Sequence, residues 1–414
     1  MKVLLVHNEY QQPGGEDIVF RLEQRLLSSF GHCVVTYRRT NHEISRYSTL
    51  RRLLLVRQMT WARDTQRDIA SLLKREMPDI VHVHNTFTQI SPSIYAECRK
   101  AEVPVVQTLH NFRLLCPGAT FYRDGGICHE CVTHGLHRSV LHGCYRNSRL
   151  ASAAVAGMLV THRRLPTWSH NIASYIALTE FARQQFIRGG LPGKKICVKP
   201  NFVNPDPGLG TQSGAYAIFV GRLSPEKGLL TLLEAWHRLG DSIPLRIVGD
   251  GPLRAELARY VEQAGLSSVR FMGRMDRSDT QKAIKEALFL ILPSGCYENF
   301  PMTIVEAFAS GTPVICSRLG AMQEIVTHMH TGLHFGPGSS QQLADSVAWG
   351  WANPERMRTM GRAARREFEL KYTAEKNYSL LMDIYHRAMQ ESLALDDRCD
   401  PETECVAAPT PVIR

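Results

Sequence analysis

Short runs of almost wholly apolar residues recur along the chain and alternate with longer segments whose apolar residues follow a helical period. In the first half, these runs lie at residues 2–6, 34–36, 80–84, 105–109, 174–178 and 196–198. Strands that are apolar on both faces are typical of a parallel sheet covered by helices on each side. The pattern therefore predicts a βα-alternating domain, in which residues 50–76 form an Arg-rich helical segment.

A second series of the same kind follows a run of Pro and Asn residues at 200–207, which predicts a linker. Its expected strands lie at 216–220, 245–248, 269–272, 288–292 and 314–316. The fold class is therefore α/β, with two Rossmann-like parallel-sheet domains at 1–205 and 206–372. We expect a final helix at 373–392 to cross back to the first domain, and a disordered tail at 393–414.

The segment 111–148 interrupts the alternation and is rich in Cys, His, Gly and Arg. It contains Cys116, Cys128, Cys131 and Cys144, and four thiolates are the usual ligand count of a closed tetrahedral zinc site. A Gly-rich segment with little core of its own gains stability from such a metal. A structural zinc is the first interpretation; an Fe–S cluster, unligated thiols and a redox pair are alternatives. A histidine could replace one thiol as a metal ligand, and the candidates are His129, His134 and His142.

The length of 414 residues exceeds what one hydrophobic core normally organises, which agrees with two domains. The formal net charge of +10 is spread unevenly along the chain. Residues 1–200 hold 27 basic and 14 acidic side chains, whereas residues 201–414 hold 22 and 25. Such asymmetry suggests an anionic partner for the first half. Nucleic acid fits poorly, because the chain has no zinc-finger His pair, RNA-binding aromatic motif or basic tail.

The basic side chains of one helical segment lie among Leu, Val, Met and Trp residues. They are Arg51, Arg52, Arg57, Arg63 and Arg67. A stretch of this composition is typical of a helix lying on an anionic membrane, and equally of a solvated helix packed on a sheet. The chain starts without a signal-peptide pattern and has no run of eighteen apolar residues. We therefore expect a cytoplasmic protein, peripheral at the inner face of the cell membrane.

Glycines and cations follow the first strands of the second series. Gly221 permits close backbone approach, Arg222 can grip two phosphate oxygens in a fork, and Lys227 supplies a point charge. Gly249 and Gly273 end the next two strands. These loops suit phosphate binding at the edge of the sheet, but an ordinary solvated βα loop has the same composition.

Two glutamates eight positions apart flank the start of a predicted helix. Pro301 suits the first turn of that helix and Asn299 suits its cap. Glu298 then lies on the preceding loop, and Glu306 about two turns inside the helix, so both can reach one elongated ligand. Free amides near Asn299 and Phe300 add donors. Two surface glutamates that form salt bridges are the alternative.

The order of these motifs resembles the GT-B glycosyltransferases of family 4. It reads Gly-Arg-Leu-x-x-x-Lys-Gly, Gly-Asp-Gly-Pro, Glu-x7-Glu and Ala-x-x-x-Gly-x-Pro-Val-Ile, after Pro13-Gly14-Gly15 and the stretch 79–84. The stretch 110–117 is similar to members linked to bacterial surface polysaccharides. The resemblance implies two domains facing across a cleft, and a retaining transfer from a nucleotide-diphosphate sugar to a lipid-linked glycan or polysaccharide acceptor held by the first domain.

The resemblance also implies roles for residues. The catalytic set is His110, Arg222, Lys227 and Glu298. The donor-binding set is Gly15, Gly221, Gly249, Gly273, Asn299, Phe300, Pro301 and Glu306. In this scheme Arg222 and Lys227 hold the diphosphate without a metal, Glu306 binds the ribose hydroxyls, and His110 lies near the reacting sugar. A purely structural His110 is the alternative, and His82 and His84 are interpreted as core packing.

Two other functions share the fold and are kept as alternatives. A nucleotide-sugar epimerase converts the donor without any acceptor. A catalytically silent nucleotide-sugar-binding partner of a membrane assembly needs no reaction at all, but Arg222, Lys227, Glu298 and Glu306 argue against silence because all four are present.

Overall fold

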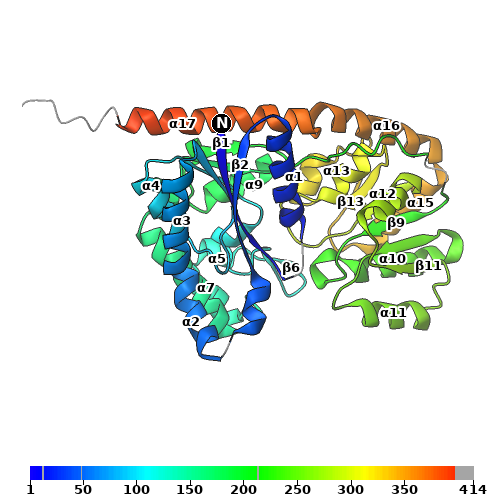
Figure 1. Ribbon diagram of the computed structural model, residues 1–414. Helices are drawn as coiled ribbons and strands as arrows, with labels where there is room; N and C mark the ends of the chain where they lie inside the picture. The colour runs from blue at the N-terminus through cyan, green and yellow to red at the C-terminus, as the bar shows by residue number, and fades with distance from the viewer. Residues whose placement is uncertain (12–13, 48, 212–213, 397–414) are drawn as a thin grey trace, which may run out of the picture.

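The computed structural model describes residues 1–11, 14–47, 49–211 and 214–396, and it contains two six-stranded parallel sheets (Figure 1). The first sheet has the order β2-β1-β3-β4-β7-β8. Its strands are β1 (Lys2–Glu9), β2 (Cys33–Thr40), β3 (Ile80–Asn85), β4 (Val105–Thr108), β7 (Ser174–Ala177) and β8 (Ile196–Val198). Its helices are α1 (Gly15–Ser29), α2 (Thr49–Thr60), α3 (Arg63–Glu76), α4 (Ile94–Lys100), α7 (Arg149–Arg164), α8 (Thr167–His170) and α9 (Glu180–Arg188).

The second sheet is also parallel and six-stranded, but it has two strands rather than one before its first strand, in the order β11-β10-β9-β12-β13-β14. Its strands are β9 (Ala217–Val220), β10 (Leu245–Val248), β11 (Val269–Gly273), β12 (Phe289–Leu292), β13 (Val314–Ser317) and β14 (Gly332–Phe335). Its helices are α10 (Leu229–Leu239), α11 (Arg254–Gln263), α12 (Arg277–Glu286), α13 (Met302–Ala309), α14 (Gly320–Ile325), α15 (Ser340–Ala352) and α16 (Pro354–Lys371). The predicted α/β class with two Rossmann-like parallel sheets is confirmed.

Both sheets are buried on their two faces, as their apolar composition predicts. In β1, every residue from Val3 to Val6 is fully buried, and Phe289–Leu292 of β12 are buried in the second domain. In both sheets the strand order reverses beside the first strand, and ligands of such sheets bind outside the carboxyl ends of the strands at that point. The fold therefore places the loops after β1, β4, β9 and β12 where a ligand is expected.

The segment 111–148 forms a small subdomain between β4 and α7. It contains the hairpin β5 (Tyr122–Arg123) and β6 (Gly126–Ile127), followed by α5 (Glu130–Thr133) and α6 (His137–His142). The hairpin strands are only two residues long, so most of this subdomain is loop and turn. Its buried side chains, including Phe121 and Cys131, join the core of the first domain.

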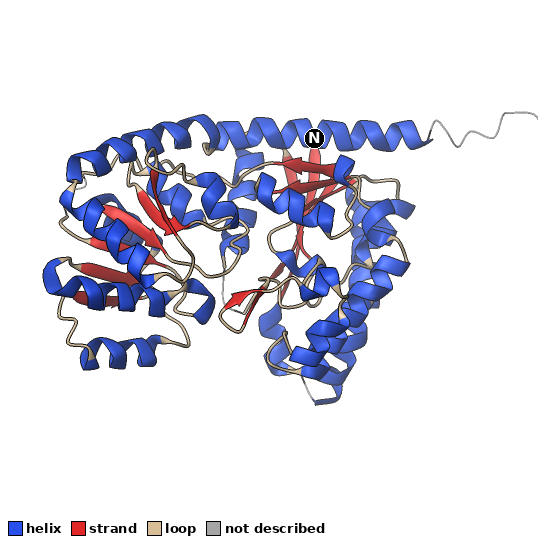
Figure 2. Cartoon of the chain, turned by 180° about the vertical axis from the view of Figure 1, so that it is seen from behind, coloured by secondary structure: helices blue, strands red, loops and turns tan. Residues whose placement is uncertain are grey.

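The last helix, α17 (Ala374–Asp396), continues the direction of α16 and lies along the first domain (Figures 1 and 2). Leu381 and Tyr385 of α17 pack with Val3, Leu5 and Phe20. Helix α17 thus packs on the domain that contains β1. From residue 397 onward, the tail expected at 393–414 lies outside the described residues, and α17 includes residues 393–396. None of the helices described here combines the length and apolar character needed to cross a bilayer.

Candidate active site

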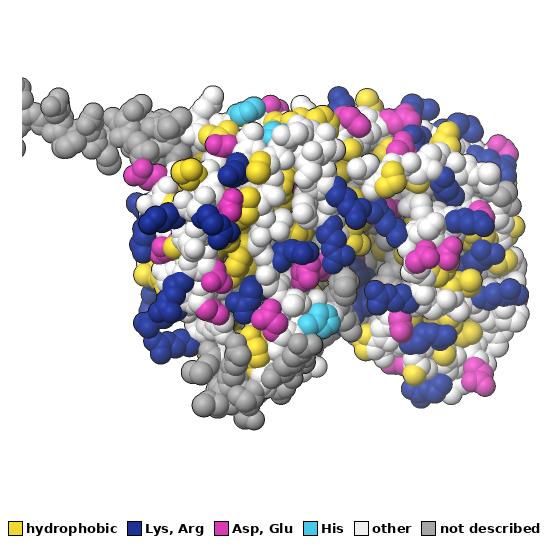
Figure 3. Space-filling view, in the orientation of Figure 1, with side chains coloured by type: hydrophobic (Ala, Val, Ile, Leu, Met, Phe, Trp, Pro, Cys, Tyr) yellow, Lys and Arg dark blue, Asp and Glu magenta, His cyan; other side chains and the backbone are white. Residues whose placement is uncertain are grey.

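A cleft of about 1050 Å³ opens between the two domains and is lined by both. Figure 3 shows the molecule hollowed between its halves. The first domain contributes Gly15 and His110, and the second contributes Arg222, Glu298 and Phe300. These residues follow β1, β4, β9 and β12, the strands whose carboxyl ends the topology brings together. Segments that are almost 300 residues apart in sequence therefore share one site.

The N-termini of two helices from different domains meet at this cleft. Helix α1 begins at Gly15, and Asp17 fixes its start by accepting a 2.6 Å hydrogen bond from the Gly14 amide. A Cβ atom on Gly15 would lie 4.0 Å from Cγ of Met302, the first residue of α13. Each helix N-terminus carries a partial positive charge and unpaired amides, so the junction favours an anion.

The cations of the second domain differ in their partners. Arg222 is exposed on the cleft, and its guanidinium has no side-chain partner among the described residues. The Lys227 ammonium donates a 2.6 Å hydrogen bond to Oε1 of Glu298, and the Ser294 hydroxyl donates to the same oxygen at 2.6 Å. Burial raises the pKa of Glu298, but the ion pair with Lys227 outweighs it and the net shift is downward. Glu298 is therefore an anion, and it orients Lys227.

The three glycines Gly221, Gly249 and Gly273 lie at the carboxyl ends of adjacent strands and contact one another. Gly249 has φ +133°, and a Cβ atom there would lie 1.9 Å from the Gly221 carbonyl oxygen. Its amide donates to the carbonyl of Gly273 at 2.8 Å. These glycines hold three loops close together. They are not among the described residues that line the cleft. Direct contact with a donor stays a prediction for them.

The cap expected before α13 is wrong. Helix α13 begins at Met302, Pro301 occupies the N-cap position in extended conformation, and no side chain caps the helix. Asn299 lies too far upstream, and its amide nitrogen instead donates a 2.6 Å hydrogen bond to the carbonyl of Leu109 at the end of the first sheet. Asn299 therefore ties the two domains together beside the cleft, and Phe300 lines it.

Glu306 lies inside α13, as its spacing from Glu298 predicts. Burial raises its pKa to about 7, and the charge of Arg277 opposes this shift only in part. Unlike Glu298, its carboxylate has no hydrogen-bond partner among the described residues. Hydrogen bonds from the hydroxyl groups of a ligand would stabilise a carboxylate that has no partner within the protein.

His110 lines the cleft, and its Nε2 lies 3.0 Å from Nδ1 of His84. Burial holds the pKa of His110 well below its usual range, so its imidazole is neutral. His82 and His84 are buried, as the packing interpretation requires, but both are also hydrogen-bonded or ion-paired.

Several residues of the cleft were not predicted from the sequence. They are Tyr10, Glu16, Asn111, Arg113 and Met302. The Asn111 amide donates to Oε1 of Glu16 at 3.3 Å, and burial raises the pKa of Glu16 to about 6. Glu16 follows Gly15 in the first helical turn, so the position of Gly15 is the signal that points to it.

The subdomain 111–148 contacts the second domain beside the cleft. The Tyr122 hydroxyl donates to the carbonyl of Pro225 at 3.4 Å, and Nε2 of His129 lies 3.2 Å from the Tyr297 hydroxyl. Both partners flank the loops that carry Lys227 and Glu298. The subdomain therefore bridges the two domains.

The four cysteines of this subdomain are free thiols that interact electrostatically. A hydrogen bond from Cys131 lowers the pKa of the Cys116 thiol to about 6. The one described set of three potential ligands whose atoms all lie within 4.8 Å is elsewhere, at Glu23, His82 and His84. The zinc assignment for Cys116, Cys128, Cys131 and Cys144 stays a prediction, and sulfur donors of this number suit zinc chemically.

Sequence profiles of two glycosyltransferase families match nearly the whole chain. "Glycosyltransferase Family 4" matches residues 13–207, and "Glycosyl transferases group 1" matches residues 209–367. The chain belongs to glycosyltransferase family 4. This family membership agrees with the motifs in both domains.

Curated relatives include glycosyltransferases from bacteria and from the archaeon Methanocaldococcus jannaschii. The chain is 32% identical over 161 residues to the D-rhamnosyltransferase WbpZ of Pseudomonas aeruginosa, covering 38% of this chain and 42% of that protein. It is 31% identical over 172 residues to O-antigen chain mannosyltransferase C of Escherichia coli, covering 41% and 46%. These matches span less than half of each relative. A phosphatidyl-myo-inositol mannosyltransferase of Mycobacterium leprae is 28% identical over 324 residues, covering 74% of this chain and 73% of that protein.

Solved structures share the fold over the whole chain. The Anabaena protein Alr3699/HepE, in complex with UDP, has a TM-score of 0.66 at 17% identity and covers 96% of this chain and 100% of its own. A glycosyltransferase from Rickettsia africae has a TM-score of 0.67 at 16% identity, with 94% and 98% covered. The fold is GT-B, with the cleft between its two domains.

Proposed function

We propose that the protein transfers a sugar with retention from a nucleoside-diphosphate sugar to a lipid-linked or polysaccharide acceptor in bacterial surface glycan synthesis. One observation carries this proposal: the cleft brings together Arg222, Glu298 with its ion-pair partner Lys227, two helix N-termini and His110 from opposite domains. That arrangement suits an anion beside a polar group rich in hydroxyls. The UDP and UDP-glucose complexes of Alr3699/HepE support a nucleotide-sugar donor.

The diphosphate would lie between the helix N-termini of α1 and α13, within reach of Arg222 and Lys227. As the bond between the anomeric carbon and the phosphate oxygen breaks, negative charge develops on the diphosphate. Preorganised cations and helix dipoles stabilise that charge without reorganising during the reaction, so no metal is required for this step. Glu298, which lines the cleft, holds Lys227 beside it through their 2.6 Å contact.

Retention follows if the acceptor hydroxyl attacks the face that the nucleotide leaves. Its oxygen then forms the new bond to the anomeric carbon, and its proton passes to the departing phosphate oxygen. In this scheme Glu306 accepts hydrogen bonds from the ribose hydroxyls. His110 contacts the sugar, and the acceptor enters along the first domain.

The acceptor class rests on the exposed surface of the first domain and on the relatives. Arg57, Arg63 and Arg67 are exposed on α2 and α3, and Leu150 of α7, a helix that packs against α2, is 86% exposed. Basic and apolar side chains of this kind suit the anionic surface of a membrane that carries a lipid-linked acceptor. The roles of the O-antigen and phosphatidyl-inositol relatives point the same way.

The test is turnover of candidate donors by the purified protein. Thermal shift with UDP, GDP, ADP and dTDP selects the nucleotide, because a ligand stabilises the folded state by mass action. Sugars of that nucleotide are then assayed for nucleoside diphosphate release. Lys227→Ala and Glu306→Ala should each reduce release by roughly a hundredfold. Lys282→Ala removes an exposed lysine from the same domain and should leave the rate unchanged.

The alternatives give different outcomes in the same assay. An isomerised donor without released nucleotide would establish the epimerase and overturn transfer. Binding of a nucleotide sugar with neither release nor isomerisation, at any acceptor tried, would favour the silent binding partner.

A further inference from the structure

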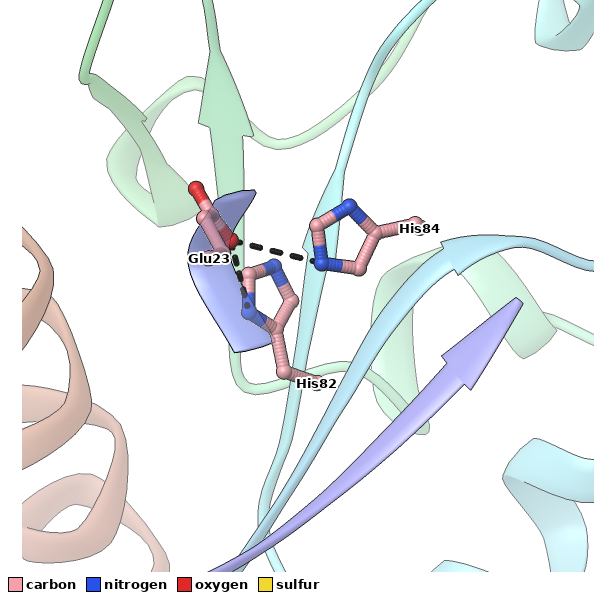
Figure 4. Close-up of side chains that lie close together, drawn as sticks. All are labelled: Glu23, His82 and His84. Carbon is pink, nitrogen blue, oxygen red and sulfur yellow. Dashed lines mark ion pairs between the residues drawn. The ribbon is translucent and has the colours of Figure 1, made fainter. Parts of the chain in front are cut away.

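A chain of buried titratable groups runs through the first domain behind His110. One carboxylate oxygen of Glu23, on α1, contacts a ring nitrogen of both His82 and His84 on β3 (Figure 4). The Lys199 ammonium, just after β8, donates a 2.6 Å hydrogen bond to Oε1 of Glu23. These four side chains are at most 2% exposed. Donor binding as described above uses none of them, so their burial needs another explanation.

The geometry argues against a metal ion at Glu23, His82 and His84. Lys199 already supplies the positive charge that the buried carboxylate requires, and a second cation beside it would be repelled. Both ring nitrogens of His82 also have partners, the Tyr385 hydroxyl at 2.7 Å and the Thr108 hydroxyl at 2.8 Å. The cluster is therefore a hydrogen-bond network.

The protons of this network have one consistent arrangement. Burial raises the pKa of Glu23, but Lys199 and the two histidines outweigh it, so the pKa falls well below its usual range and Glu23 only accepts hydrogen bonds. Its Oε2 lies 3.3 Å from Nε2 of His84 and 3.6 Å from Nδ1 of His82. The His82 nitrogen is hydrogen-bonded to the Tyr385 hydroxyl, whereas Nε2 of His84 has no partner other than this carboxylate in the described part of the chain. The proton of His84 therefore lies on Nε2.

The tautomer of His84 determines the tautomer of His110. Burial lowers the pKa of His84, so its imidazole is neutral and its Nδ1 accepts a hydrogen bond. The atom facing Nδ1 is Nε2 of His110, at 3.0 Å, and it must donate. His110 is also neutral, which leaves its Nδ1 without a proton.

We propose that Glu23 and His84 are positioning residues that hold His110 in its Nε2-protonated tautomer, so that Nδ1 accepts a hydrogen bond from a sugar hydroxyl in the cleft. The identity of that hydroxyl as part of a donor or acceptor sugar rests on the proposed function, whereas the tautomer does not. Without Glu23, the proton of His84 can move from Nε2 to Nδ1. His110 would then carry its own proton on Nδ1 and present a hydrogen-bond donor to the cleft.

The tautomer is measured directly by nitrogen NMR on protein labelled with ¹⁵N-histidine, without substrate. His110→Gln assigns the His110 signals. His162 is the internal reference, because its Nε2 faces the Thr60 carbonyl at 2.8 Å and must be protonated. We expect His110 to carry its proton on Nε2 in the unaltered protein. A proton on Nδ1, or on both nitrogens at neutral pH, would overturn the proposal.

Glu23→Gln gives a sharper result. Lys199 can only donate, so it meets the amide oxygen of the new side chain, and the amide NH₂ then faces His84. His84 must become an acceptor at Nε2, and both His84 and His110 should switch to the Nδ1-protonated tautomer while His162 does not. An unchanged His110 tautomer in a folded Glu23→Gln protein would overturn the proposal. The variant's folded state is checked by its His162 signals, and the unaltered protein decides alone if the variant does not fold.

A kinetic readout separates positioning from a merely structural effect. Glu23→Gln should lower kcat at least tenfold while the Kd of the nucleoside diphosphate selected by thermal shift changes less than twofold, since neither Glu23 nor the side chains that contact it line the cleft. Equal losses in kcat and nucleotide affinity would contradict a positioning role. If the unaltered protein turns over no donor, the proposed function fails while the tautomer experiment still decides this inference.

Discussion

Two glutamates of one sequence motif have opposite electrostatic states. Glu298 lies 2.6 Å from Lys227, and that cation holds its pKa below the usual value in spite of burial. Glu306 lies eight positions later without such a partner, and desolvation raises its pKa to about 7. Spacing in a sequence shows that two carboxylates can reach one ligand, but only the neighbours of each carboxylate determine its charge.

The state of Glu306 predicts a pH dependence of donor binding. In the proposed binding mode, ribose hydroxyls donate to the ionised carboxylate. With a pKa of about 7, the ionised fraction falls from about nine-tenths to one-tenth between pH 8 and pH 6. Since the apparent Kd scales with the inverse of the competent fraction, nucleotide affinity should fall roughly tenfold over this range. Isothermal titration with the selected nucleoside diphosphate at several pH values measures it.

Glu306→Gln is the matched control, because it retains the hydrogen-bonding oxygen and the size of the side chain but cannot ionise. Titration of the diphosphate itself is common to both proteins and cancels in the comparison. The variant should bind with a flatter pH profile than the unaltered protein. Parallel profiles for the two proteins would show that Glu306 does not govern binding.

Residue identities alone indicated part of the cleft lining, and the differences between prediction and structure have physical causes. Arg222, Lys227 and Glu298 are charged residues that follow strands, where the topology makes the site visible in the sequence. Asn299 was misassigned as a cap because Asn before an apolar run commonly caps a helix, whereas here its amide bonds Leu109 in the other domain. A partner 190 residues away leaves no local signal.

At the level of elements, the alternating apolar runs predicted ten strands of the two large sheets. The short run 196–198, interpreted only as leading into the linker, is β8, and β14 was missed. β14 is an edge strand, and its sequence, Gly-Leu-His-Phe, is short and contains Gly and His. It therefore forms no apolar run that would reveal a strand. The predicted helical segment 50–76 is two helices, α2 and α3, that meet at Trp61 and Ala62. No Pro or Gly marks that break.

The three loops that end β9, β10 and β11 depend on Gly249. A side chain there would combine an unfavourable φ of +133° with a Cβ atom 1.9 Å from the Gly221 oxygen. We expect Gly249→Ala to lower the free energy of unfolding by about 3 kcal/mol or more, from backbone strain and overpacking together. Gly157→Ala is the control: it lies within α7 with open space around it and should stabilise by about 1 kcal/mol. Urea denaturation measures both, and a neutral Gly249→Ala would contradict the assignment.

Metal analysis of the purified protein tests whether the cysteines of the subdomain 111–148 hold zinc. Protein purified without chelator should contain about one zinc per chain by mass spectrometry. Cys131→Ser should lose the metal and lower the melting temperature, because the subdomain has little core of its own. Cys33→Ser removes an exposed thiol outside it and should keep the zinc. Iron in place of zinc would favour the Fe–S alternative, and the absence of both metals would leave unligated thiols.

Loss of that metal should also alter the loops that line the cleft. Tyr122 and His129 contact Pro225 and Tyr297 of the second domain, so a loosened subdomain would no longer hold the loops that carry Lys227 and Glu298. Sequence reasoning placed this segment at the mouth of the cleft from its position after His110 alone. It did not show the bridging contacts, because each requires the arrangement of both domains.

At the scale of the whole molecule, helix α17 connects the end of the chain to the buried network of the first domain. Tyr385 bonds His82 at 2.7 Å, and the Asn377 side chain accepts from Lys199 at 3.1 Å while donating to the Pro200 carbonyl at 2.6 Å. In the sequence, these two residues are ordinary members of an amphipathic helix. Their roles arise only when α17 lies against β1, β3 and the end of β8, a placement that no local pattern encodes.

The uneven charge of the molecule leads to a prediction about membranes. The basic first half has exposed Arg57, Arg63 and Arg67 on α2 and α3. Cations near an anionic bilayer are each worth about 1 kcal/mol, so replacing all three by Gln should weaken partition by on the order of a hundredfold. Flotation with vesicles containing anionic lipid measures this, and vesicles of neutral lipid alone should bind far less of the unaltered protein.

The control removes the same charge from the other domain. Arg259, Arg356 and Arg366 are exposed on α11 and α16, and their triple replacement by Gln changes the net charge equally. If net charge alone drives binding, both triple variants will float less. If the first domain faces the bilayer, only the first variant will lose binding, and its loss should shrink as salt screens the surface. Equal flotation on neutral and anionic vesicles would contradict an electrostatic membrane surface on the first domain.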